Sequence, residues 1–210
     1  SLGGAGNVAA NLAALECSEV CALGVIGVDP FGEEMARILQ RAGINSTGIV
    51  RQQSEWDTCA YTKVLETDGE ECRESNRIDY GNFNRLRPET ADRLTTHLSN
   101  MLDSSTIDAV IINQQLRNGI HTTRLQHSLQ TLVRLHPNTM WVTDSRDFSP
   151  IYSGTVLKIT ETEAANIARM EKSVDGPIGS TTETAYELFS RRKKPVFITR
   201  DNRGCITCGQ

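Results

Sequence analysis

The chain has 210 residues, of which 38% are hydrophobic and 23% are charged, and its formal net charge is -4. This length allows one sizeable domain, and the composition excludes disordered, collagen-like and coiled-coil chains. The small negative charge gives no broad attraction to nucleic acid or to an anionic membrane, and no apolar run is long enough to span a bilayer. We therefore expect neither nucleic acid nor a membrane as a partner.

The first residues, Ser1-Leu2-Gly3-Gly4, contain no methionine and have neither the basic region nor the apolar stretch of a signal peptide. We expect a fragment of a longer, cytoplasmic protein. Six cysteines are thinly spread, and only Cys205 and Cys208 have CxxC spacing. On an extended strand these two thiols point to opposite faces, which suits neither a zinc site nor a redox helix. We therefore expect reduced thiols and no metal–thiolate site.

The first forty residues predict two helices around a buried strand. An Ala-rich helix is expected over residues 6–15, and the apolar run at 20–26 indicates a strand. Asp29 followed by Pro30 is typical of a helix start, and the helix that follows ends at Gly43.

In residues 44–80 short strand-like segments replace the alternation of helices and strands, which predicts a β excursion rather than a strand–helix unit. Short strands are expected at 44–51, 58–65 and 71–78, with a hairpin turn at 67–70.

After residue 80 helices and strands alternate again. The predicted helices cover 88–103, 121–136, 161–170 and 182–192, and the predicted strands cover 107–112, 140–143, 156–159 and 196–199. Strands separated by helices of this length indicate a parallel sheet with right-handed crossovers, hence an α/β fold.

Open α/β sheets bind ligands at the carboxyl ends of their strands, so the loops there are the candidate sites. The Gly-rich run Gly3-Gly4-Ala5-Gly6-Asn7 opens the first helix. It suits close approach of a ligand to a helix N-terminus, and it equally suits a tight turn with Asn7 as the cap.

Several motifs in order resemble the ribokinase-like (PfkB) carbohydrate kinases. Residues 3–13 (GGAGNVAANLA) are similar to the first signature of that family, and residues 24–32 (GVIGVDPFG) to its GxxGxDxxG segment. Residues 143–149 (TDSRDFS), followed by Tyr152-Ser153-Gly154, resemble a stretch of the heptose-phosphate kinase branch.

The resemblance implies a three-layer α/β fold, with a mainly parallel central sheet flanked by helices. It implies that residues 1–210 form a truncated kinase domain with a small β lid at about 44–80, through which a homodimer is expected. Members transfer the γ-phosphoryl group of ATP, with Mg2+, to a hydroxyl of a sugar or sugar phosphate. Such chemistry needs a base, a metal and anion-stabilising donors in line.

The resemblance also assigns site residues. The sugar-binding candidates are Gly3, Gly4, Asn7, Gln114 and Gln115. The nucleotide-binding candidates are Asp144, Arg146, Thr160, Thr199 and Gly204, and Glu163 is the candidate for the metal.

Each assignment has a structural alternative. Asp144 and Arg146 suit a solvated loop ion pair, Thr160-x-x-Glu163 is also a helix capping box, and residues 199–204 suit a β-hairpin turn closed by Gly204.

The family's GAGD motif, which carries the catalytic base, does not occur in the 210 residues. The resemblance therefore assigns no catalytic residue to this chain, and we expect the chain alone to be inactive. The alternative is a non-catalytic sugar- or nucleotide-binding or dimerisation module. A dinucleotide-binding dehydrogenase is disfavoured because GxGxxG and its ribose-binding acid are missing.

Overall fold

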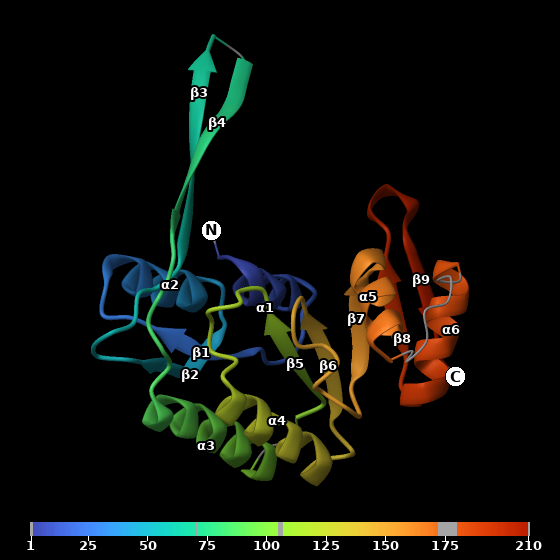
Figure 1. Ribbon diagram of the computed structural model, residues 1–210. Helices are drawn as coiled ribbons and strands as arrows, with labels where there is room; N and C mark the ends of the chain where they lie inside the picture. Colours follow the sequence, from blue (N-terminus) through green and yellow to red (C-terminus); the bar gives the residue numbers. More distant parts are fainter. Residues whose placement is uncertain (1, 70, 105–106, 172–179, 210) are drawn as a thin grey trace. The chain divides into compact units, whose positions relative to one another are not determined.

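The computed structural model describes residues 2–69, 71–104, 107–171 and 180–209 (Figure 1). The chain divides into two compact units, the first made of residues 1–98 and 118–120 and the second of 99–117 and 121–210. Among the helices in the described ranges, none has the length and apolar character needed to cross a membrane.

The first unit begins with a strand–helix–strand arrangement preceded by a helix. Its elements are α1 (Gly4–Ala14), β1 (Cys21–Ile26), α2 (Pro30–Arg41) and β2 (Asn45–Arg51). Strands β1 and β2 pair in parallel, so α2 is the crossover between them. A core cluster joins these elements through Leu2, Ala9, Leu39 and Ile44.

The parallel pairing of β2 corrects the expected extent of the β excursion. Ile49 lies opposite Gly24, Arg51 lies opposite Ile26, and Val50 is buried. Residues 45–51 therefore belong to a strand–helix–strand unit, and the excursion starts after them. The pattern within 44–51 cannot reveal this, because it is compatible with pairing on either side.

The excursion itself is the antiparallel hairpin of β3 (Ala60–Asp68) and β4 (Glu71–Tyr80). In Figure 1 it runs away from the other elements of its unit as a two-stranded ribbon, and nearly all of its residues are exposed. The turn was expected at residues 67–70. Gly69 has a φ of +62°, a conformation that favours glycine, whereas residue 70 is outside the described residues.

Asp29 ties the start of α2 to the chain that leads into the hairpin. Its Oδ1 accepts from the backbone N–H of Gly32 at 2.8 Å, and its Oδ2 accepts from that of Thr58 at 2.9 Å. Burial raises the pKa of Asp29, but these bonds outweigh it and the net pKa is lowered. A Cβ at Gly27 would lie 2.2 Å from Asp29 Oδ2 and 2.4 Å from the carbonyl oxygen of Trp56, so only glycine fits there.

Two buried amides join the segments that enter and leave the hairpin. The side chain of Gln52 donates to the carbonyl of Arg85 at 3.3 Å and accepts from the N–H of Arg87 at 3.0 Å. Asn82 accepts from the N–H of Asp57 at 3.2 Å. Both strands of the hairpin therefore leave from one hydrogen-bonded base.

The second unit is built on a five-stranded sheet. Its strands are β5 (Ala109–Gln114), β6 (Met140–Ser145), β7 (Val156–Thr160), β8 (Val196–Thr199) and β9 (Cys205–Cys208), in that order across the sheet. The first four are parallel, and β9 is antiparallel to β8. The expected mainly parallel sheet is confirmed.

Helices precede or connect most of these strands in the sequence. They are α3 (Pro88–Ser104), which begins in the first unit, α4 (Thr123–Leu135), α5 (Glu161–Glu171) and α6 (Thr181–Arg192). A core cluster packs α5 and α6 on β7 and β8; it contains Leu157, Ile159, Ala164, Ile167, Ala185, Leu188, Val196 and Ile198. Burial alternates along β7 and β8, so one face of these strands packs against the helices.

Both cysteines of the CxxC pair lie on the extended strand β9, so their thiols point to opposite faces, as predicted. Cys205 is exposed, whereas Cys208 is half-buried and packs against the core cluster. Both are free thiols, and no group of three or more potential metal-ligating side chains occurs in the described residues.

Candidate functional site

Three polar side chains lie side by side across β5, β6 and β7, one residue before the ends of β5 and β6 and two before the end of β7. In the sheet Asn113 is opposite Asp144, and Asp144 is opposite Lys158. The ammonium nitrogen of Lys158 lies 3.2 Å from each carboxylate oxygen of Asp144, and Asn113 Nδ2 donates to Oδ2 at 3.4 Å. The Lys158 side chain is 41% exposed, so its cation can meet a ligand from solvent.

Lys158 was missed by the sequence analysis. The signal was a single cation inside the apolar strand at 156–159, because a charge at such a position usually has a specific partner. Asp144 pairs with Lys158, so the alternative in which its ion-pair partner is Arg146 is wrong. Arg146 is exposed in the loop that follows.

Gln114 differs from the expectation of a sugar contact. It is only 2% exposed, and its Oε1 accepts from the hydroxyl of Ser145 at 2.7 Å. Its Nε2 donates to Asp147 Oδ2 at 3.0 Å. This bond, opposed by partial burial and supported by Arg117, lowers the pKa of Asp147. Gln115, the next residue, is half-buried.

A buried histidine–tyrosine pair supports the end of β5. His121 Nε2 lies 3.3 Å from the carbonyl oxygen of Asn113, and its Nδ1 lies 2.7 Å from the Tyr152 hydroxyl. A carbonyl oxygen only accepts, so Nε2 carries the proton and Nδ1 accepts from tyrosine. Burial lowers the pKa of His121 to about 4 and raises the pKa of Tyr152. The pair is therefore neutral.

The start of α5 is a complete capping box. The N–H of Thr160 donates to Glu163 Oε2 at 2.8 Å, and the N–H of Glu163 donates to Thr160 Oγ1 at 3.3 Å. The structural interpretation of Thr160-x-x-Glu163 is confirmed. The metal role of Glu163 stays a prediction.

Glu161 links the start of α5 to the turn after β8. Its carboxylate accepts from the hydroxyl of Thr181 and forms an ion pair with Arg203. The bond from Thr181, and then the charge of Arg203, lower the pKa of Glu161. Glu161 therefore stays ionised and holds this turn in place.

The turn itself requires an unusual backbone. Thr199 lies opposite Thr160 in the sheet and donates to the carbonyl of Ile159 at 3.3 Å. Gly204 has a φ of +81°, although a Cβ there would meet nothing within 4 Å, so its conformation rather than space requires glycine. The residues close a β8–β9 hairpin, which confirms that interpretation and leaves nucleotide contact a prediction.

The Gly-rich start lies in the first unit. Gly3 is the N-cap of α1, Gly4 has a φ of +30°, and Asn7 is exposed within the helix. The alternative of Asn7 as the cap is therefore wrong. The helix starts earlier than predicted, since the carbonyl of Gly3 already accepts from the N–H of Asn7 at 3.1 Å.

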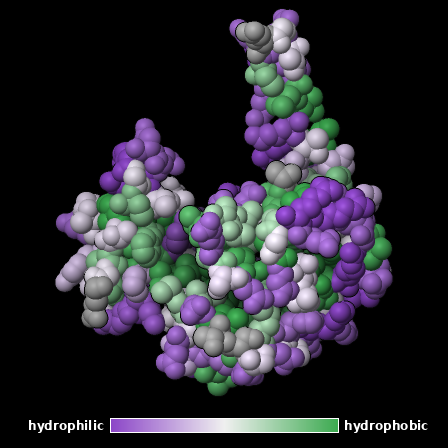
Figure 2. All heavy atoms as spheres, turned by 180° about the vertical axis from the view of Figure 1, so that it is seen from behind, coloured by the Kyte–Doolittle hydropathy of each residue, from purple (hydrophilic) through white to green (hydrophobic). Residues whose placement is uncertain are grey.

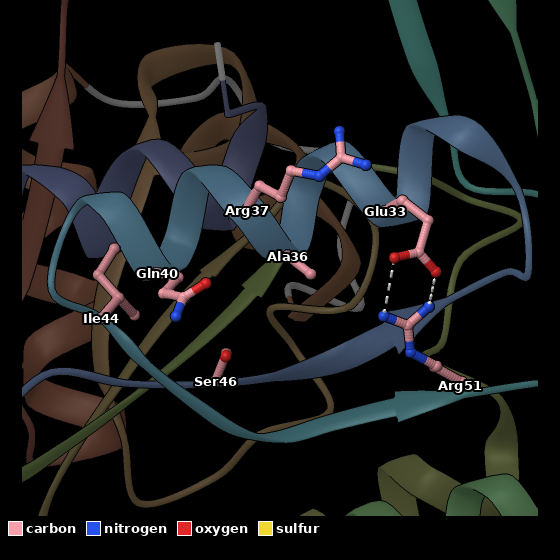
Figure 3. Close-up of a pocket in the computed structure, with 7 residues that line it drawn as sticks. All are labelled: Glu33, Ala36, Arg37, Gln40, Ile44, Ser46 and Arg51. Carbon is pink, nitrogen blue, oxygen red and sulfur yellow. Dashed lines mark hydrogen bonds and ion pairs between the residues drawn. The ribbon is translucent and has the colours of Figure 1, made fainter.

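An open hollow of about 410 Å3 lies between α2 and β2 (Figure 3). Its lining is Glu33, Ala36, Arg37, Gln40, Ile44, Ser46 and Arg51. The ion pair of Glu33 and Arg51 spans one end, as Figure 3 shows. None of the predicted site residues lines it.

The second unit thus brings together most of the predicted nucleotide-side residues along the carboxyl ends of its strands. The whole chain, residues 1–210, matches the pattern of the pfkB family carbohydrate kinases. The chain belongs to this carbohydrate kinase family. The predicted family and its transferase class are thereby confirmed.

Curated relatives and solved structures agree with this membership. The bifunctional protein HldE of Wolinella succinogenes is 29% identical over 205 residues, which cover 97% of this chain and 41% of that protein. The tetrameric inhibited form of phosphofructokinase-2 from Escherichia coli superposes with a TM-score of 0.70 at 16% identity, covering 99% of this chain and 65% of that chain. An uncharacterised sugar kinase from Pyrococcus horikoshii in complex with ATP gives a TM-score of 0.61 at 12% identity, with 99% and 64% coverage.

These likenesses confirm the predicted ribokinase-like α/β fold. The chain spans about two fifths of the length of the HldE relative and about two thirds of that of the structural neighbours. Its pfkB membership therefore identifies a class of kinase and not a substrate.

Proposed function

We propose that this chain is part of a PfkB-type kinase that transfers the γ-phosphoryl group of ATP to a hydroxyl of a sugar or sugar phosphate. The observation that carries the proposal is the row of Asn113, Asp144 and Lys158 near the carboxyl ends of the strands, in a chain that belongs to this family. Phosphoryl transfer depends on placed charges rather than on covalent chemistry by the protein, and this row supplies them.

The nucleotide phosphates are the proposed ligand of Lys158 and Arg146. Asp144 already balances the charge of Lys158, at 3.2 Å from each oxygen, and so holds the ammonium group in place. The phosphates of a nucleotide would then be a second anionic partner, after Asp144, for the oriented ammonium group of Lys158. Arg146 adds an exposed, planar guanidinium that can bind two phosphate oxygens.

Glu163 is the proposed contact for Mg2+, and it would contribute one carboxylate oxygen. This cation is usually held by one or two carboxylates together with substrate phosphates and several waters. Glu163 Oε2 accepts from the N–H of Thr160, which orients the group and leaves Oε1 as the oxygen for a water of the metal. When bound, Mg2+ neutralises charge that develops on the transferred phosphoryl group.

The sugar is the proposed ligand of the first unit's glycines and Asn7. Gly3, Gly4 and Asn7 are exposed at the start of α1. A Cβ at Gly3 would meet nothing within 4 Å, so open space surrounds this backbone. The amide of Asn7 both donates and accepts, which suits a sugar hydroxyl. Gln115 is the remaining candidate from the predicted sugar set.

The hairpin is the proposed lid and dimer interface. One face carries Val64, Ile78 and Tyr80, with exposed fractions of 39%, 48% and 48%. Phe31 of α2 packs on the ring of Tyr80, with ring centroids 5.1 Å apart. Figure 2 shows hydrophobic atoms exposed along the hairpin. A two-stranded hairpin is marginal alone, so cover by a ligand or a second copy would stabilise it.

The opposite face of the hairpin, the ionic face, carries two ion pairs beside the exposed side chains of Tyr61 and Leu65. Lys63 pairs with Glu74 at 2.7 Å, Arg77 pairs with Asp79 at 2.7 Å, and the Arg77 guanidinium lies 5.4 Å from the ring centre of Tyr61. The ion pairs of Lys63 and Arg77 favour the other face, that of Val64, Ile78 and Tyr80, as the interface; we call it the apolar face.

A binding module without catalytic activity is the second candidate, favoured by Gln115, Ser145 and Thr160, which replace the residue types that the resemblance leads us to expect. The test is to assay the full-length protein that contains this chain against a panel of sugars and sugar phosphates, with ATP and Mg2+. The kinase proposal expects sugar-dependent ADP release from the full-length protein and none from the 210 residues alone. Nucleotide and sugar binding without turnover in the full-length protein would instead support the binding module.

A further inference from the structure

The side chain of Gln114 fills its hydrogen-bonding capacity inside the protein. Oε1 accepts from the hydroxyl of Ser145 at 2.7 Å and from the N–H of Asp147 at 3.0 Å. Nε2 donates to Asp147 Oδ2 at 3.0 Å and to the carbonyl of Leu116 at 3.1 Å. An amide has two donors and two acceptor positions, and all four are used here. No group of this side chain is left for a sugar.

These bonds determine the backbone of the loop after β6. The carbonyl of Gln114 accepts from the N–H of Arg146 at 3.1 Å. The Ser145 hydroxyl that donates to Gln114 also accepts from the N–H of Phe148 at 2.9 Å. Three consecutive N–H groups, those of residues 146 to 148, are thus held by Gln114 or by a hydroxyl bonded to it.

The loop is also joined to the segment after β5 by charge. Arg117 donates to Asp147 Oδ1 at 3.0 Å, while Oδ2 of the same carboxylate is bonded to Gln114. Asp147 is therefore committed to internal contacts, whereas the side chain of Arg146 is exposed.

We propose that Gln114 is a positioning residue for nucleotide binding and not a sugar ligand. It holds residues 145–149 in the conformation that presents Arg146, next to Asp144, to the phosphates of a nucleotide. The inference has two parts, that Gln114 shapes the loop and that the loop binds a nucleotide. The second part, the nucleotide half, rests on the proposed function. The shaping of the loop by Gln114 can be tested without that function.

The first test is Gln114→Met in the full-length protein, because methionine has a similar volume and makes none of the four bonds. Amide hydrogen exchange at residues 146–148 should become faster, while exchange in β7 and β8 stays as in the parent. The dissociation constant for a non-hydrolysable ATP analogue should rise roughly ten-fold, since a few ordinary hydrogen bonds order the loop. Sugar affinity should be unchanged.

Gln52→Met is the matched control, because Gln52 is also a glutamine with 2% exposure but lies in the first unit. It should leave both the exchange at 146–148 and the affinity for the ATP analogue unchanged.

The second test exchanges donor and acceptor. Gln114→Glu alone places a carboxylate against that of Asp147, at a present separation of 3.0 Å, and should weaken binding of the analogue at least as much as Gln114→Met. Combining it with Asp147→Asn restores a donor opposite an acceptor between these two side chains, but not the bond to the carbonyl of Leu116, so the dissociation constant should improve clearly over that of Gln114→Glu without returning to the parent value.

Unchanged affinity for the analogue in Gln114→Met would overturn the inference, as would a double variant no better than Gln114→Glu. A parent protein that does not bind the analogue contradicts the proposed function, and with it the nucleotide half of this inference. In that case faster exchange at 146–148 would still support the shaping of the loop by Gln114, and unchanged exchange would overturn that as well.

Discussion

Glu163 has a structural role that is observed and a metal role that is proposed. Gln can make the same capping bond to the N–H of Thr160, so Glu163→Gln should change the melting temperature by only a few degrees. If the carboxylate orders Mg2+ through water, the Mg2+ requirement should rise and turnover should fall roughly ten-fold or more. The measurement is a Mg2+ titration of turnover in the full-length protein.

The chain contains its own control for this experiment. Ser180 and Glu183 form a second capping box at the start of α6, with bonds of 2.6 and 3.3 Å. Glu183→Gln should reproduce any loss from capping alone. Equal effects of Glu163→Gln and Glu183→Gln on the Mg2+ dependence would leave Glu163 a purely structural residue.

His121 predicts a pH dependence of stability. Its folded pKa is about 4, lowered by burial from the ordinary value of 6.5. As the pH falls from 6.5 to 4, the unfolded chain takes up a proton that the folded chain does not, so the free energy of unfolding decreases across this window. The full loss is about 3 kcal/mol.

His121→Gln removes this titration and keeps the bonding pattern, because an amide can donate to the carbonyl of Asn113 and accept from Tyr152. Thermal unfolding between about pH 7 and pH 5 should then show a smaller decrease than in the parent. An equal slope in both proteins would assign the acid sensitivity to other groups.

At the scale of elements, the hairpin predicts how the chain associates. Ile78 lies opposite Thr62 on the apolar face, so Ile78→Lys places a charge in the proposed interface without creating a charged pair across the strands. The full-length parent should sediment as a dimer, and Ile78→Lys should shift it towards the monomer because burying an unpaired ammonium is unfavourable.

Leu65→Lys is the matched control for this variant. Leu65 lies on the ionic face opposite Glu74, where a lysine gains a partner. It should leave the sedimentation coefficient of the dimer unchanged. A parent that sediments as a monomer, or equal behaviour of the two variants, would contradict association through the apolar face.

At the scale of the whole molecule, the two units predict separate effects on the two ligands. Asn7, a sugar candidate of the first unit, and the nucleotide candidate Lys158 belong to different compact units. In the full-length protein, Asn7→Ala should weaken sugar binding by roughly 1–3 kcal/mol and leave nucleotide binding nearly unchanged. Lys158→Met should do the reverse, with a roughly ten-fold loss of nucleotide affinity.

Calorimetric titration with each ligand alone separates these contributions. Equal sugar affinity in Asn7→Ala and the parent would remove Asn7 from the site. Weaker binding of both the sugar and the nucleotide in either variant would indicate a damaged fold rather than the loss of one contact.

The sequence by itself determined the local features of this chain. Asp29 caps α2, Thr160 and Glu163 form a capping box, and Gly204 occupies a conformation that glycine favours. Each depends on residues a few positions apart, so the spacing of residue types is enough to predict it. The alternation of helices and strands predicted the α/β class for the same reason, and several motifs in order indicated the family.

Only the tertiary structure decided which distant residues meet. The same strand pattern at residues 45–51 suits a lid or a parallel partner, and its register with β1 made it the latter. Lys158 and Asp144 became an ion pair, and Gln114 a buried support for the loop, because strands far apart in sequence lie next to each other. Pairing across strands depends on burial and register summed over the whole sheet, and no short segment carries that information.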